Sequence, residues 1–174
     1  GDPDKDGFVE YQRATEQGLV NQGWKDSFDA IFHADGQLAD GYIALAEVQG
    51  YVFAGKQLAA RCARRLGMAE RAAQLDAAAL RLAERVEAAC WCEELGTYAL
   101  ALDGDKPPCR VRTSNAGQLL FTGLVQTARA RRVAADLLRP GKVAQTGLDA
   151  GRPLLESISD MMGYWSFFEN FIQI

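Results

Sequence analysis

The sequence predicts an all-α protein with one small β-hairpin inserted between its helices. Apolar residues recur at helical spacing over residues 43–66, and again over residues 69–89. Gly67 separates the two stretches and supplies a helix stop. Two long helices joined by so short a link predict an antiparallel αα-hairpin. Over residues 98–112 the pattern becomes that of two strands around a turn, which predicts the β-hairpin.

The first helix is expected to pack through Leu45, Val48, Val52 and Cys62. The second carries a cleaner apolar stripe, made of Leu75, Ala79, Leu82 and Val86. Ser114 or Asn115 is the predicted cap of a short helix that continues through Phe121. A last amphipathic helix is predicted over residues 125–138, with its arginines Arg129, Arg131 and Arg132 facing outward.

Composition limits the classes of function. The chain has 174 residues, 48% of them hydrophobic and 24% charged, which is ordinary for one globular domain. A formal net charge of -4 argues against a surface for nucleic acid. No apolar run is long enough to span a bilayer, and the chain does not open on a signal peptide. We therefore expect a cytoplasmic protein without membrane contact, and nothing in the sequence calls for a cofactor.

Cysteine and histidine usage argues against metal and triad chemistry. The cysteines lack the paired spacing of a zinc site and are expected to be free thiols, most of them small apolar residues; they are Cys62, Cys90, Cys92 and Cys109. His33 is the only histidine, and no nucleophile elbow is present. We interpret His33 as a residue that hydrogen-bonds within a loop.

The first ten residues imitate half of a calcium loop. Asp2, Asp4 and Asp6 alternate before Gly7, but Arg13 stands at the twelfth position, where an EF-hand needs a bidentate glutamate. A calcium site of another kind is the alternative. An Asp-rich turn that leads into a short strand over residues 8–11 is the better interpretation, and micromolar calcium should leave the melting temperature unchanged.

Residues 21–31 hold a dense cluster of amides, aromatic rings and carboxylates. A site for sugar cleavage needs an aromatic face, donors for hydroxyl groups and a carboxyl group that protonates the glycosidic oxygen. Trp24 offers the face, Gln22 and Lys25 offer donors, and Asp26 offers the carboxyl group. A helix cap is the alternative role for Asp26. Glu47 is a further candidate, because a carboxylate on an apolar helix start is costly to bury unless it faces a polar cavity; an ordinary exposed glutamate is the alternative.

Four motifs occur in order along the chain: residues 18–27 (GLVNQGWKDS), 46–51 (AEVQGY), 94–103 (ELGTYALALD) and 112–117 (RTSNAG). Together they resemble the bacterial amylo-α-1,6-glucosidase, or glycogen-debranching, family. The resemblance implies part of an (α/α)6 barrel and an inverting glycosidase that acts on α-glucan or oligosaccharide. It makes Asp26 the general acid, and it places the substrate-binding residues Gln22, Trp24, Lys25, Glu47, Gln49 and Asn115 at the site.

The resemblance covers residues 1 to about 140, so we expect a partial glycosidase-like domain there. Over residues 141–174 the sequence departs from the family and ends in an aromatic cluster that could drive self-association. The family's distal segment, with its catalytic base, has no counterpart. We therefore expect a fragment with little glucosidase activity of its own. A catalytically incomplete module that binds sugar or supports structure is the alternative, and a helical module for protein interaction is a third hypothesis.

Overall fold

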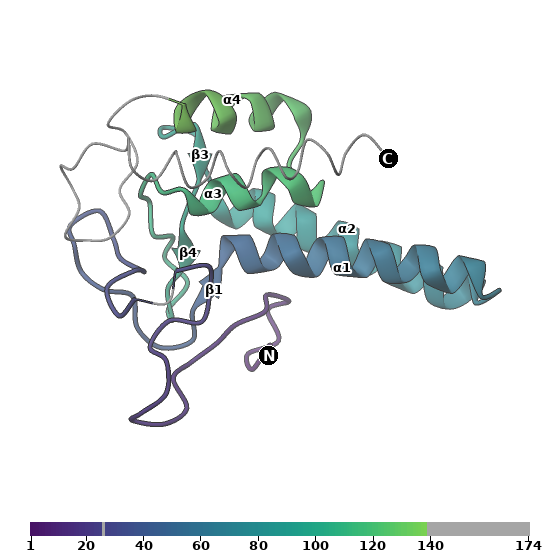
Figure 1. The fold of residues 1–174 in the computed structure, drawn as a ribbon, viewed down its shortest axis with the longest axis horizontal. Helices are drawn as coiled ribbons and strands as arrows, with labels where there is room; N and C mark the ends of the chain where they lie inside the picture. Colours follow the sequence, from purple (N-terminus) through teal and green to yellow (C-terminus); the bar gives the residue numbers. More distant parts are fainter. Residues whose placement is uncertain (26, 139–174) are drawn as a thin grey trace.

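The computed structural model describes residues 1–25 and 27–138. Two long antiparallel helices, α1 and α2, form a hairpin whose far end projects from the body of the molecule (Figure 1). Loops, short strands and two shorter helices gather around its other end. The elements are β1 (Ala44–Leu45), α1 (Ala46–Arg65), α2 (Ala69–Cys90), β2 (Trp91–Cys92), β3 (Thr97–Tyr98), β4 (Ala101–Leu102), α3 (Asn115–Gln118), the 3-10 turn η1 (Leu120–Thr122) and α4 (Thr127–Leu137).

The predicted αα-hairpin is confirmed, and its turn has a clear local cause. Gly67 adopts a left-handed conformation with φ +75°, and its N–H bonds the carbonyl of Arg64 at 3.1 Å. Met68 N–H bonds the carbonyl of Ala63 at 2.9 Å. These bonds satisfy carbonyls at the end of α1 and reverse the chain into α2.

The apolar stripe predicted for α2 faces the core, whereas the prediction of the inward-facing residues of α1 is partly wrong. Ala79, Leu82 and Val86 are buried. On α1, Cys62 is exposed, because Phe53 and the small residues near the far end form the inward face. All four cysteines are free, and the other three are buried, as the sequence predicted.

The predicted β-hairpin has different strands from those expected. β4 pairs in antiparallel fashion with β1, in the register Ala44↔Leu102 and Leu45↔Ala101. Residues 109–112 form no strand; the returning chain is held by Cys109 N–H on Ala101 O at 2.8 Å and by an isolated bridge at Pro108. A second small hairpin joins β2 to β3. Residues 8–11 also fall short of a strand and make one bridge, Tyr11↔Ile43.

Two apolar clusters hold these elements together. The larger lies where α1 and α2 meet α3, η1 and α4, and includes Phe53, Leu82, Val86, Leu119 and Val133. The smaller packs residues 30–32 against β1, β4 and Cys109. The smaller cluster supports the segment that carries the predicted site, because residues 30–32 follow that segment directly.

The arginines of α4 do not simply face solvent. The guanidinium carbon of Arg129 lies 4.3 Å from the centre of the Trp91 ring, and that of Arg132 lies 5.0 Å from it. Arg129 also pairs with Glu87, and Arg112 pairs with Asp136 of α4 at 3.0 Å. The docking of α4 is thus partly electrostatic.

The predicted tail, residues 141–174 with their aromatic cluster, lies outside the described residues, as does the domain boundary near 140. Among the residues that the structure describes, no helix is both long and apolar enough to cross a membrane.

Candidate functional site

The centre of the candidate site is Glu47, in the first turn of α1. Its side chain is fully buried, at 0% exposure. One carboxylate oxygen, Oε1, accepts the backbone N–H of Trp24 at 2.6 Å, and the other, Oε2, accepts the side-chain amide of Asn115. Glu47 therefore joins three segments that are distant in the sequence: the Trp24 loop, α1 and α3.

The position of Glu47 follows from the local fold. The pairing of β1 with β4 fixes the chain immediately before α1, so that the first turn begins beneath the Trp24 loop. A carboxylate in the first turn of a helix is favoured by the helix dipole. Burial raises the pKa of Glu47, while the hydrogen bonds from Trp24 and Asn115 and the charge of Lys25 act in the opposite direction.

Asn21 shapes the loop that presents Trp24. This asparagine is buried; its Oδ1 accepts the hydroxyl of Tyr11 at 2.8 Å. Its Nδ2 donates to the carbonyl of Ser27 at 2.6 Å and to that of Phe28 at 3.2 Å. The Asn21 side chain thereby joins the start of the loop to Ser27 and Phe28 at its end, and to Tyr11 outside it. Sequence reasoning includes Asn21 in the cluster but misses this role, because its partners are backbone carbonyls that no residue pattern reveals.

The Trp24 ring is open although its backbone is fixed. Trp24 is 46% exposed, and Phe28 in the same loop is 65% exposed. On α1, Tyr51 stacks on Phe121 with ring centres 5.9 Å apart, and both rings are partly exposed. Burial, and secondarily the charge of Glu47, raises the pKa of Tyr51 to about 12. Aromatic side chains with a few polar groups among them commonly line small-molecule sites.

The other predicted residues lie in different environments. Gln22 is exposed and lines an open groove of about 480 Å³ together with Tyr11, Arg13 and Tyr42. Lys25 is half-buried and lies near enough to Glu47 to influence its charge. Asp26, the predicted general acid, lies outside the described residues.

Gln49 serves the N-terminal segment. It is fully buried; its Oε1 accepts Val9 N–H at 2.9 Å, and its Nε2 donates to the carbonyls of Val9 at 2.7 Å and Leu45 at 3.1 Å. Asn115 is also buried, and within the described residues its Oδ1 has no hydrogen-bond partner. The structure thus brings Trp24, Lys25, Glu47 and Asn115 together and turns Gln49 toward the backbone.

His33 has the loop role that the sequence predicted. Its Nε2 lies 2.7 Å from Asp103 Oδ2 and 3.8 Å from the thiol of Cys109. A catalytic relay would need the carboxylate on one ring nitrogen and the nucleophile on the other. Here Nε2 faces both Asp103 and Cys109, so these three residues do not form such a relay. Burial raises the pKa of Cys109 to about 12, so the thiol is inert.

A pH dependence follows from the raised pKa of Glu47. A carboxyl group whose pKa is higher in the folded state binds its proton more tightly there, so its contribution to stability is present below the ordinary glutamate pKa and is lost as the pH rises through the folded value. The stability of the wild type relative to Glu47→Gln should therefore fall as the pH rises above the ordinary glutamate pKa. Urea unfolding at several pH values measures this, with the exposed Glu84→Gln as control. A constant difference would contradict it.

Comparison with known structures relates this fold to that of a glycoside hydrolase. One structural neighbour is the GH78 family rhamnosidase of Bacillus sp. GL1, with a TM-score of 0.57 and 19% sequence identity. The match covers 91% of this chain and 17% of the rhamnosidase chain. No protein-family model and no curated protein matches the sequence. The likeness supports a glycosidase-like helical fold, while the debranching family and the (α/α)6 barrel stay predictions.

Proposed function

We propose that this chain forms part of a glycoside hydrolase-like domain and binds the α-glucosidic end of a glucan or oligosaccharide. The observation that carries the proposal is the buried Glu47 carboxylate, which holds the backbone of Trp24, a residue that is 46% exposed. A rigid loop that presents an exposed aromatic ring suits the apolar face of a pyranose, because the loop loses little freedom on binding.

The residues take separate roles in this proposal. Trp24 stacks on the sugar, and Lys25 and Gln22 donate to its hydroxyl groups. Glu47 and Asn115 are buried, so they act as positioning residues beneath the loop and do not contact the sugar directly. Asp26, two residues after Trp24, is the proposed general acid of an inverting reaction.

Inverting hydrolysis needs a second carboxyl group, about 6.5–9.5 Å from the acid, to activate water. Glu47 is a poor candidate for that base, since both of its oxygens accept hydrogen bonds and the side chain has no exposed surface. We therefore propose that the chain alone binds sugar and turns it over slowly or not at all.

Sugar binding is tested by calorimetry with maltose, isomaltose and rhamnose. The wild type should bind a glucoside with millimolar affinity, and Trp24→Ala should weaken that binding about tenfold, through the loss of one aromatic contact. Leu80→Ala, an equally open apolar residue on α2, should bind like the wild type. Absence of binding to either glucoside would refute the proposal. Preference for rhamnose would keep a sugar site but overturn the α-glucoside assignment.

Catalysis is tested separately, by measuring glucose release from isomaltose. We expect release close to the blank for the wild type and for Asp26→Asn. Substantial release that Asp26→Asn abolishes would establish the acid and show that the chain has a base. Equal and substantial release by both would remove Asp26 from the mechanism.

A further inference from the structure

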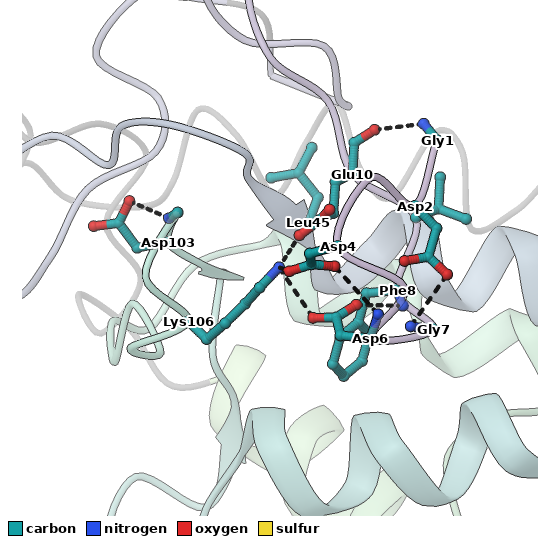
Figure 2. Close-up of polar contacts among 12 residues, drawn as sticks. Gly1, Asp2, Asp4, Asp6, Gly7, Phe8, Glu10, Leu45, Asp103 and Lys106 are labelled. Atoms are coloured by element: carbon teal, nitrogen blue, oxygen red, sulfur yellow. Dashed lines mark hydrogen bonds and ion pairs between the residues drawn. The ribbon is translucent and has the colours of Figure 1, made fainter.

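The acidic loop at residues 2–10 is the densest group of charges outside the Glu47 site. Its aspartates fold the loop by accepting backbone N–H groups: Gly7 N–H bonds Asp2 at 3.2 Å, and Phe8 N–H bonds Asp6 at 2.9 Å (Figure 2). Gly7 has φ +90°, which the turn requires. The aspartate side chains thus fold the loop through its own backbone N–H groups.

A lysine from a distant part of the chain enters the centre of this loop. Lys106, in the turn after β4, places its Nζ 3.0 Å from Asp4 Oδ2 and 3.0 Å from Asp6 Oδ2, and forms an ion pair with Glu10 Oε1. Figure 2 shows the ammonium group reaching three carboxylates at once. Burial acts to lower the pKa of Lys106, but the hydrogen bonds to Asp6 and Asp4 outweigh it and raise the pKa, so the group stays charged.

Glu10 indicates that the cluster is built for a cation. Its side chain has 0% exposure, and among the described residues its Oε2 has no hydrogen-bond partner. Ligand oxygens of Asp2, Asp4 and Glu10 lie within 4.8 Å of one another, close enough to share one metal ion. Three carboxylates, those of Asp4, Asp6 and Glu10, contact one ammonium, so the cluster keeps an excess of negative charge.

Lys106 ends the turn after β4 in an unfavourable backbone conformation. Its φ of 71° lies in the left-handed region, which is unfavourable for a residue with a side chain. The conformation is held by Lys106 N–H on the carbonyl of Asp103, at 2.7 Å, and by the ion pairs.

We propose that the Lys106 ammonium is the resident cation of the loop: it occupies the place that calcium takes in a calcium loop, keeps the loop folded without metal, and excludes a divalent ion. Removing it opens a calcium site formed by Asp2, Asp4 and Glu10, whose ligand oxygens lie within 4.8 Å of one another. Calcium prefers such a set of carboxylate oxygens. On this proposal, calcium does not change the melting temperature of the wild type for two reasons. The Lys106 ammonium fills the centre of the loop, and the ligand at the twelfth position is missing.

The test compares thermal unfolding with chelator and with about 2 mM calcium, a concentration that saturates weak loop sites. Lys106→Met removes the charge, keeps an unbranched side chain that is one atom shorter, and leaves the left-handed backbone conformation unchanged in cost. Lys5→Met is the matched control, since Lys5 lies in the same loop with φ 61° and is exposed. We expect no response to calcium from the wild type or Lys5→Met. Lys106→Met should melt lower in chelator and gain about 3 °C or more in calcium.

Adding Asp4→Asn to Lys106→Met should abolish the gain, which separates this loop from other acidic surfaces. A wild type that calcium stabilises as much as the variant would overturn the proposal. So would a Lys106→Met chain that folds equally well with and without calcium, or one that stays unfolded even in calcium, because the proposal requires the ion to replace the ammonium.

Discussion

Replacing Glu47 with alanine is expected to lower the free energy of unfolding by about 2–4 kcal/mol and to abolish sugar binding. The substitution leaves two buried donors, Trp24 N–H and the Asn115 amide, without an acceptor, at a cost of about 1–3 kcal/mol each. Relief from burying a carboxylate offsets part of that cost. The Trp24 loop then loses its attachment to α1, so the sugar-binding face is no longer held in place.

Urea unfolding and calorimetry measure the two effects on the same samples. Glu84→Ala removes an exposed glutamate from α2 and should change stability by no more than about 0.5 kcal/mol. If Glu47→Ala proved as stable as that control, the carboxylate would not be the anchor of the loop. If it lost stability but bound sugar normally, Glu47 would be structural only.

The second large effect is expected for Gly23→Ala. A Cβ at this position would lie 2.2 Å from Leu45 Cδ1 and 2.8 Å from Glu47 Oε1. Neither neighbour can move freely, since Leu45 is 1% exposed and Glu47 is fully buried. Overpacking should cost about 1–3 kcal/mol and displace the loop from α1, with a matching loss of sugar affinity.

Gly55→Ala is the matched control for this substitution. Gly55 lies in α1, and no neighbouring heavy atom lies within 4 Å of the position that an added Cβ would take. Alanine there should therefore be neutral or stabilising by about 0.5–1 kcal/mol. Unfolding curves and sugar titrations of the two variants give the comparison. A Gly23→Ala chain with wild-type stability and affinity would show that the loop does not pack on Leu45 and Glu47.

The long helices could be predicted from the sequence because their signals are local. The apolar period of α2 and the glycine before its start identify the element and its inward face without reference to the rest of the chain. The sequence pattern starts α1 too early, at Ile43, since the run Ile43-Ala44-Leu45 fits a helix and a strand equally well. Ala44 and Leu45 form a strand because they pair with β4, which lies more than fifty residues away in the sequence.

The candidate site was predictable in its residue types but less so in its geometry. Glu47 stood out because a carboxylate at an apolar helix start is costly to bury unless it faces a polar cavity; in the structure it is buried against two hydrogen-bond donors, Trp24 N–H and the Asn115 amide. Asn115 was suggested by the family resemblance and proved to be one of those partners. Gly23 and Asn21 lie in the predicted cluster, but their roles could not be predicted, because these roles depend on distant side chains and on backbone carbonyls. Asp26 stays a prediction, since it lies outside the described residues.

The amide of Gln49 imitates a peptide group: it offers Val9 an acceptor and a donor, as a neighbouring strand would. The N-terminal segment is therefore recognised through its main chain, and the identity of the Val9 side chain matters little to this attachment. This contact therefore restricts substitutions at residue 49 more than at residue 9. Residue 9 can drift among many types, whereas residue 49 must keep a primary amide, because glutamate would set a carboxylate against the carbonyls of Val9 and Leu45.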